Sequence, residues 1–255
     1  MKLSKDFLIF IGIVLLGLIL RMLFLDKAGG LWYDELLGSY NEAAQPNIFA
    51  VISYTMKNDI HFPLYQIFLH YWGNIFSFSD YSLRLFSVFC GSLNVIVAYF
   101  IGNDLKSRQT GLICAAVFAI NSFLIYYSQE VRMYSFLVLL ASCYLLFAVR
   151  TKNDYKNKVN YILFVLFAFA LIMSYTISFI FVIAQFVILF IYLINEHKED
   201  KRSILKHAIW SFFFLILFCL PIFIYFITHK AQYSGFMSGF FSNWTSFLVS
   251  VQDWF

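Results

Sequence analysis

The chain has 255 residues, of which 62% are hydrophobic, 22% are aromatic and only 13% are charged, and its formal net charge is +4. A single soluble core could not bury the apolar runs that this composition produces, whereas lipid solvates them directly, so the composition excludes a water-soluble domain. We therefore predict an all-α polytopic membrane protein. We expect no nucleic-acid partner, and the absence of a Gly-rich phosphate loop disfavours an ATP-driven transporter.

Seven apolar runs are long enough to cross a bilayer, because a helix rises about 1.5 Å per residue and the hydrocarbon core is about 30 Å thick. The first run is too long for the apolar part of a signal peptide, and no good small-residue cleavage site follows it. The fifth and sixth runs are fused, so the polar residues within 174–178 are expected to turn the chain between two helices. We treat residues 1–255 as one transmembrane domain with predicted spans at 7–25, 83–101, 111–127, 133–149, 159–175, 177–194 and 204–227.

The distribution of positive charge predicts the orientation of these spans. With the N-terminus in the cytoplasm, the inner segments carry 12 of the 18 Lys and Arg residues, as the positive-inside rule requires. These 12 are Lys2, Lys5, Lys106, Arg108, Arg150, Lys152, Lys156, Lys158, Lys198, Lys201, Arg202 and Lys206. Residues 26–82 then form a large outer loop.

The outer loop contains an acidic pair and an amphipathic segment. Asp34 and Glu35 lie just beyond the first span, where adjacent carboxylates beside a bilayer call for a functional explanation. Apolar residues recur at positions 64, 67, 68, 71, 72 and 75 behind Pro63, which predicts a helix along the outer membrane interface. Another short helix is expected over residues 35–44, with Asp34 near its N-terminus.

The cysteines and histidines give no indication of a metal centre or a disulfide framework. The four cysteines all fall within predicted spans, where a free Cys packs as a small apolar side chain, and none forms a zinc-ligand pattern with His. Two adjacent acids are too few to argue for a cation, so we assign no metal. The cysteines are Cys90, Cys114, Cys143 and Cys219.

Four motifs follow one another along the first part of the chain. The acidic pair at 34–35 is followed by His-Phe-Pro-Leu-Tyr at 61–65, by Tyr-Ser-Leu-Arg-Leu at 81–85 and by Tyr-Ser-Gln-Glu-Val-Arg-Met-Tyr at 127–134. In this order they resemble the N-terminal half of a GT-C glycosyltransferase of family 39, akin to protein O-mannosyltransferases and the aminoarabinose transferase of lipid A. Relatives continue with several more spans, so we expect this chain to be a fragment or a short variant that needs a partner.

The resemblance implies a bacterial plasma-membrane enzyme that takes a sugar from a polyprenyl-phosphate carrier. The sugar would pass, with inversion, to a protein, lipid or glycan acceptor on the outer face. Asp34 would be the general base, and Glu35 an orienting partner or a contributor to acceptor binding. The family signature falls on Gln129, Glu130, Arg132 and Tyr134.

The chemistry of such a transfer calls for the same types of residue. An attacking hydroxyl must lose its proton, which a carboxylate within hydrogen-bond reach can accept. The departing phosphate develops negative charge, which a neighbouring cation stabilises. Arg132 is the first candidate for that role and Arg84 the second, and His61 is a further candidate for substrate binding.

Each assignment has a structural alternative. Asp34 could cap a helix, and Glu35 could be a solvated acid in its first turn. Arg132 and Arg84 could anchor the outer ends of spans, His61 could be an interfacial hydrogen-bonding residue, and Tyr134 could belong to an aromatic belt. A function of another class also stays open, namely a lipid-linked sugar flippase or an assembly subunit for polysaccharide. The sparse ionisable residues near the middle of the spans favour the enzyme.

Overall fold

The computed structural model describes residues 5–25, 29–59 and 61–228, and every regular element within these ranges is helical. The chain divides into two units, residues 1–215 and 216–255, and the site described below lies in the first. The elements are α1 (Lys5–Met22), α2 (Tyr33–Glu35), η2 (Leu36–Tyr40), α3 (Asn41–Ala43), α4 (Ile48–Asn58), α5 (Leu64–Ile75), α6 (Asp80–Leu105), α7 (Arg108–Ile120), α8 (Ser122–Tyr127), α9 (Tyr134–Asn153), α10 (Lys158–Ser174), α11 (Ser178–Glu196), η3 (Lys198–Asp200) and α12 (Lys201–Thr228).

Within the described residues, four helical stretches are long and apolar enough to cross a membrane, namely Asp80–Leu105, Tyr134–Asn153, Ser178–Glu196 and Lys198–Leu220. The helices α7 and α10 are apolar but shorter, and α1 carries three charged residues, Lys5, Asp6 and Arg21, within its 18 residues. The predicted class, an all-α polytopic membrane protein, is therefore confirmed. The count of seven crossings stays a prediction.

The predicted third span, 111–127, is not one continuous helix. α7 ends at Ile120, and α8 begins at Ser122, because Asn121 leaves the helical conformation with ψ at 116°. The Asn121 side chain accepts a hydrogen bond of 3.0 Å from the backbone N–H of Leu124, which caps the new helix. The apolar run alone could not reveal this break, because Asn can either continue a helix or cap one.

Small residues let α1, α6 and α7 approach closely. A methyl group added to Gly17 of α1 would lie 3.2 Å from Cβ of Ala119 and 3.3 Å from Cγ2 of Val95. Val95, Ala115 and Ala119 are fully buried, and Ile13 of α1 packs against them. Backbone contact through small side chains is the usual way in which membrane helices associate.

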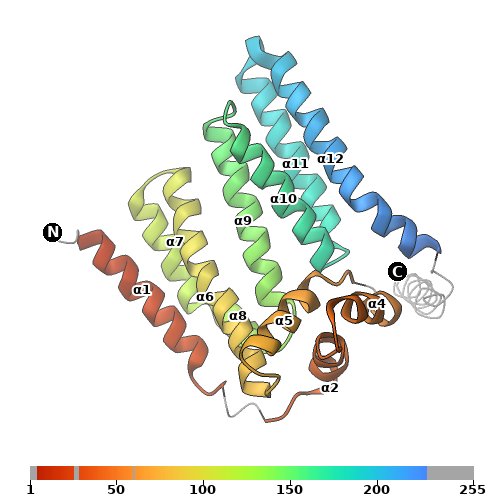
Figure 1. Cartoon of the computed structure of the whole chain (residues 1–255). Helices are drawn as coiled ribbons and strands as arrows, with labels where there is room; N and C mark the ends of the chain where they lie inside the picture. The colour runs from red at the N-terminus through yellow and green to blue at the C-terminus, as the bar shows by residue number, and fades with distance from the viewer. Residues whose placement is uncertain (1–4, 26–28, 60, 229–255) are drawn as a thin grey trace, which may run out of the picture. The chain divides into compact units, whose positions relative to one another are not determined.

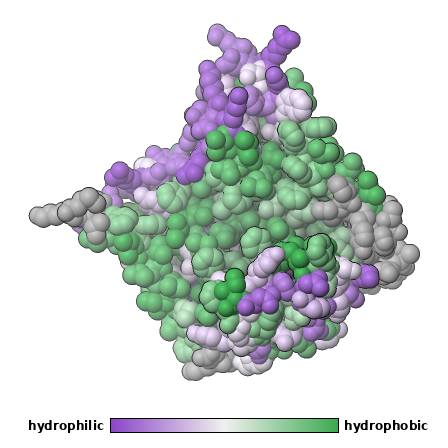
Figure 2. All heavy atoms as spheres, in the orientation of Figure 1, coloured by the Kyte–Doolittle hydropathy of each residue, from purple (hydrophilic) through white to green (hydrophobic). Residues whose placement is uncertain are grey.

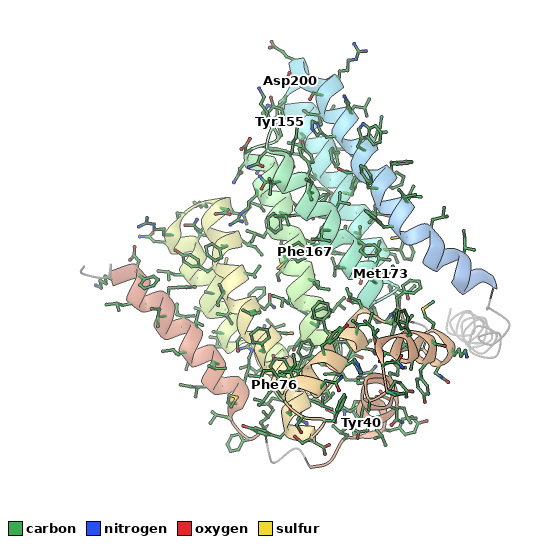
Figure 3. All side chains as sticks on the ribbon, viewed as in Figure 1. Tyr40, Phe76, Tyr155, Phe167, Met173 and Asp200 are labelled. Carbon is green, nitrogen blue, oxygen red and sulfur yellow. The ribbon has the colours of Figure 1, made fainter. Side chains whose placement is uncertain are left out.

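The short helices α2 to α5 gather at one end of the long helices of the first unit (Figure 1). Tyr40 lies at that end, whereas Tyr155 and Asp200 lie at the other (Figure 3), where the Tyr155 hydroxyl donates a hydrogen bond to Asp200. On the face shown in Figure 2, hydrophobic side chains cover the middle and hydrophilic ones collect toward both ends. This distribution suits a chain surrounded by lipid between two polar layers.

Two of the helical segments in the outer loop were predicted from the sequence, and a third was not. The predicted helix after Pro63 forms as α5, and the helix expected over residues 35–44 forms as the continuous segment of α2, η2 and α3. The helix α4 was not predicted. Asn47 caps it by accepting a hydrogen bond of 3.0 Å from the backbone N–H of Ala50.

Candidate active site

The helical segment from Tyr33 to Ala43 positions the acidic pair. Its N-cap is Trp32, so Asp34 lies inside the first turn and does not cap the helix. Residues four apart share a helix face, so Asp34, Gly38 and Glu42 lie on one side of the segment. The following residue, Glu35, points toward the interior and is only 1% exposed. The two adjacent carboxylates therefore have different surroundings.

Glu35 holds three separate pieces of the chain together. One carboxylate oxygen accepts hydrogen bonds from the backbone N–H of Trp32 at 3.1 Å and from Nη2 of Arg84 at 3.2 Å. The other accepts a bond of 2.7 Å from the backbone N–H of Val131. The alternative of a solvated first-turn acid does not hold for a side chain so enclosed.

Arg84 of α6 completes this buried pair and is 3% exposed. Its guanidinium also donates to the carbonyl oxygens of Gly29 and Gly30, at 3.0 and 3.3 Å. These contacts hold the chain that leads from α1 to the acidic pair. Both of its terminal nitrogens are thus engaged by protein groups, which leaves Arg84 poorly placed to bind a substrate phosphate.

Asp34 lines a polar cavity of about 450 Å³ that opens beside this ion pair. The cavity walls come from the Tyr33–Ala43 segment, from α4 and the turn after it, and from the segment before α9. The lining residues are Asp34, Leu37, Gly38, Glu42, Tyr54, Asn58, Asp59, His61 and Arg132. Three of the predicted site residues, Asp34, His61 and Arg132, are therefore brought together.

Arg132 reaches the cavity with its guanidinium fixed from two sides. Nη1 donates a hydrogen bond of 2.9 Å to the backbone carbonyl of Asp34, and the Tyr134 ring lies 5.7 Å from the guanidinium carbon. Neither Arg132 nor the Asp34 carboxylate has an ion-pair partner among the described residues. A cation and a carboxylate are thus available to a ligand in the same cavity.

Gly38 leaves room for the Arg132 side chain. A methyl group added at Gly38 would collide with Nη1 of Arg132. Gly38 belongs to the π-helical turn η2, and such turns are frequent at functional sites. Glycine at position 38 therefore lets the backbone of this segment lie close to the Arg132 guanidinium.

Glu42 is a second carboxyl group of the cavity and is only 2% exposed. Thr55 donates a hydrogen bond of 3.4 Å to it, and Gln66 is a further hydrogen-bonding neighbour. Burial, followed by repulsion from Asp59, raises the pKa of Glu42 to about 8, although Gln66, Thr55 and Arg132 oppose the shift. Glu42 therefore keeps its proton at neutral pH.

His61 is 9% exposed and its ring packs against that of Tyr175 in a tilted arrangement, with ring centroids 4.4 Å apart. Its backbone N–H donates a hydrogen bond of 3.1 Å to the Asp59 carboxylate, and its buried Nδ1 has no hydrogen-bond partner among the residues that the structure describes. Burial lowers the pKa of His61, as does Arg132 to a smaller degree, while Asp59 opposes the shift. The imidazole is thus held toward its neutral form, and the turn between α10 and α11 packs against the site through Tyr175.

The other residues of the predicted signature lie outside this cavity. Gln129 donates to the backbone carbonyls of Arg21 and Leu23, at 3.1 and 2.8 Å, and so holds the end of α1. The Glu130 backbone carbonyl accepts a bond of 2.6 Å from Ser87. Burial and, to a smaller degree, repulsion from Glu35 raise the pKa of the Glu130 side chain.

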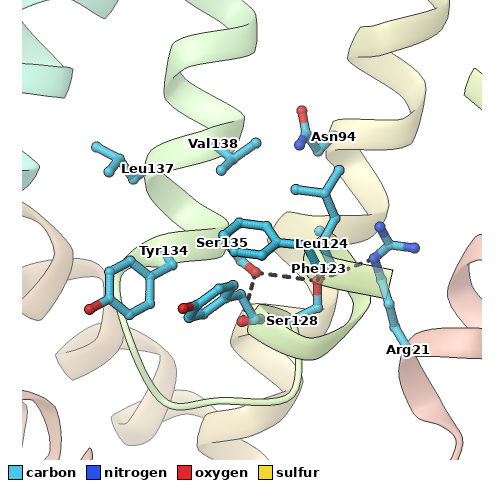
Figure 4. Close-up of a pocket in the computed structure, with 11 residues that line it drawn as sticks. Arg21, Asn94, Phe123, Leu124, Ser128, Tyr134, Ser135, Leu137 and Val138 are labelled. Atoms are coloured by element: carbon cyan, nitrogen blue, oxygen red, sulfur yellow. Dashed lines mark hydrogen bonds between the residues drawn. The ribbon is translucent and has the colours of Figure 1, made fainter. Parts of the chain in front are cut away.

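A separate cavity of about 190 Å³ lies between the helices, and Tyr134 lines it rather than the acidic cavity (Figure 4). The fully buried Arg21 borders it and donates to Oγ of Ser128 at 3.2 Å. The same guanidinium donates to the carbonyl oxygens of Phe118 and Ala119, at the broken end of α7. Arg21 therefore stabilises the interruption between α7 and α8.

A metal ion finds no evident ligand set in the described part of the chain. Among residues 5–25, 29–59 and 61–228, no group of three or more His, Cys, Asp and Glu side chains could hold one. The four cysteines are free.

A family model described as dolichyl-phosphate-mannose-protein mannosyltransferase matches residues 61–229, which is more than half of the chain. The chain belongs to this family. The resemblance to family 39 glycosyltransferases is thereby confirmed, and the protein is a membrane glycosyltransferase of the mannosyltransferase type. The matched segment begins after the acidic pair, so it does not itself bear on Asp34. No curated protein and no solved structure matches the chain.

The sequence-based site omitted several residues of the cavity, above all Glu42 and Asp59. The spacing of residues 34, 38 and 42 in the helix expected over 35–44 already places Glu42 on the same face as Asp34, but this signal was not used. Asp59 lies only two residues before His61, next to the His-Phe-Pro-Leu-Tyr motif. Tyr175 was not among the predicted substrate-binding residues, because its contact with His61 joins parts of the chain that are far apart in sequence.

Proposed function

We propose that this mannosyltransferase-family protein moves a sugar from a polyprenyl-phosphate carrier to an acceptor hydroxyl at the outer face of the membrane. One observation carries the proposal: an acid, Asp34, and a cation, Arg132, line the same polar cavity, of about 450 Å³. Cavities of about 300 to 1,000 Å³ are typical of small-molecule sites. Mannose is the first sugar to test, because the family description names it.

In the proposed reaction, the acceptor hydroxyl attacks the anomeric carbon from the face opposite the phosphate. The new carbon–oxygen bond forms as the bond to the phosphate oxygen breaks, which inverts the anomeric centre. As the acceptor hydroxyl attacks, its oxygen becomes less basic and its proton more acidic, and Asp34 accepts that proton. The bonding electrons leave with the polyprenyl phosphate, whose developing charge Arg132 stabilises.

Glu35 and Arg84 serve this proposal as positioning residues. Their ion pair ties the start of the Tyr33–Ala43 segment to α6, and the Glu35 bond to Val131 holds the backbone beside Arg132. Asp34 and Arg132 are thereby supported by one buried network. A rigid support matters because small errors in the placement of reacting groups lower the rate strongly.

The membrane supplies the setting for both substrates. The carrier is itself a membrane lipid, and the acceptor is a protein, a lipid or a glycan hydroxyl that reaches the outer face. The positive-inside distribution of Lys and Arg supports that side for the cavity.

The proposal is tested with membranes that contain the unmodified protein and polyprenyl-phosphate mannose labelled in both the sugar and the phosphate. We expect release of the carrier phosphate together with a mannosylated acceptor, whose anomeric configuration is opposite to that of the donor. Arg132→Ala should slow release about 100-fold, as loss of one charge-stabilising donor commonly does, whereas Arg202→Ala, an exposed arginine of α12, should not.

The same preparation separates the enzyme from its rival. Translocation of the labelled lipid across vesicles without any release of carrier phosphate would contradict the proposal and favour a flippase. Retained anomeric configuration would contradict the single-displacement mechanism alone.

A further inference from the structure

Two carboxyl groups of the Tyr33–Ala43 segment are almost equally buried but differ in their partners. Glu35, 1% exposed, is paired with Arg84 at 3.2 Å and accepts two backbone N–H groups. Glu42, 2% exposed, receives hydrogen bonds from the neutral side chains of Thr55 and Gln66, and no Lys or Arg forms an ion pair with it among the described residues. A buried carboxylate without a contacting cation is costly, so the surroundings of Glu42 favour its neutral form.

The titratable groups that line the cavity together with Glu42 come from each element around it. Asp34 lies on its own helical segment, Tyr54 on α4, Asp59 and His61 on the turn after α4, and Arg132 before α9. Asp59 disfavours the charged form of Glu42, and Arg132 only partly offsets this repulsion. Gln66, on α5, carries no charge.

We propose that Glu42 is a further substrate-binding residue of the site, which acts as a neutral acid and donates a hydrogen bond to an oxygen of the transferred sugar. This inference rests on the proposed function, because it takes the sugar to occupy the cavity of Asp34. A protonated carboxyl group can donate a hydrogen bond, whereas the proposed base Asp34 has to accept one, so these two of the three acids that line the cavity have complementary tasks.

The hydrogen bond that Glu42 donates to the sugar should depend on pH. The pKa of Glu42 is raised to about 8, so the donated proton is present at neutral pH and is lost as the pH rises through that value. Ionised Glu42 would also repel Asp59. Binding of polyprenyl-phosphate mannose should therefore weaken as the pH rises through that value. Glu42→Gln should not show this loss of affinity, because its amide donates a hydrogen bond at every pH.

The first test is independent of turnover. Infrared difference spectroscopy of the unmodified protein should show the carbonyl band of a neutral carboxyl at pH 7, which Glu42→Gln removes and Glu199→Gln, an exposed acid of η3, leaves in place. Addition of polyprenyl-phosphate mannose should shift that band. If Glu42→Gln removes no band, or if the donor fails to shift it, the inference is overturned whatever the turnover.

The second test uses kcat/KM for release of the carrier phosphate. Glu42→Ala should lower it about tenfold at pH 7, the typical effect of losing one hydrogen bond, and Glu42→Gln should recover most of that loss. If Glu42→Ala and Glu42→Gln lower kcat/KM equally and both fold in normal amounts, Glu42 does not act as a hydrogen-bond donor, although the proposed transfer itself still stands. A donor-induced band shift without turnover in the unmodified protein would instead support Glu42 and contradict the proposed transfer.

Discussion

At the scale of single residues, Asp34 and Glu35 are neighbours in sequence but not in environment. Successive residues of a helix point about 100° apart, so one of the pair enters the buried ion pair and the other enters the cavity. The sequence could predict that an acidic pair mattered at this position. It could not predict the division, because the partners of Glu35 come from residues 84 and 131, which only the fold brings near.

The buried ion pair should matter chiefly for stability. We expect Glu35→Gln to lower the free energy of unfolding by about 3 kcal/mol or more, because it leaves the buried Arg84 cation without its counter-charge. Asp104→Asn is the matched control, since it breaks the half-exposed pair of Asp104 with Arg150, which should contribute about 1 kcal/mol or less. Thermal unfolding of both variants in one detergent measures the difference, and equal losses would contradict this account.

At the scale of elements, the Tyr33–Ala43 segment is the part that sequence patterns describe least well. Its first helical turn is only three residues long and is followed by a five-residue π-helical turn. Periodicity cannot reveal such a turn, because the pattern of apolar residues assumes 3.6 residues per turn. The amphipathic helix after Pro63 was predictable for the opposite reason, since α5 keeps a regular apolar face through 12 residues.

Gly38 gives a test at this scale. A methyl group at Gly38 must displace the Arg132 guanidinium, which then loses its bond to the Asp34 carbonyl. We expect Gly38→Ala to weaken binding of the polyprenyl-phosphate donor about tenfold, as the loss of one charge-assisted hydrogen bond would.

The matched control is Gly12→Ala in α1, where an added methyl group meets no atom within 4 Å. Its donor affinity should equal that of the unmodified protein. A Gly38→Ala variant that binds the donor normally, measured by titration of purified protein, would show that the position of Arg132 is not important for carrier recognition.

At the scale of the whole molecule, hydropathy and charge predicted the class and the approximate positions of the long helices. The predicted spans overlap α1, α6, α7 with α8, α9, α10, α11 and α12. Interruptions within a span were beyond reach, because the cap at Asn121 depends on one side-chain bond, and the break is stabilised by Arg21 from another helix. The composition of a segment indicates whether lipid or water surrounds it, but not where its backbone leaves the helical conformation.

The predicted orientation has its own test. In a variant without native cysteines, Ser53→Cys on α4 should react with a membrane-impermeant thiol reagent in intact cells, because residues 26–82 form the predicted outer loop. Glu199→Cys, between α11 and α12, should react only after the membrane is opened. Both positions are exposed in the structure. Labelling of Ser53→Cys only in opened membranes would reverse the orientation and move the cavity to the cytoplasmic side.

In the proposed transfer, Asp34 accepts the proton of the attacking hydroxyl. The measurement that tests it most directly compares donor binding with release of carrier phosphate in the same purified preparation of Asp34→Asn. Asn keeps the size of the side chain and cannot act as the base, so we expect the Kd for polyprenyl-phosphate mannose to change no more than about twofold while release slows at least about 100-fold. Release at the rate of the unmodified protein would contradict the claim.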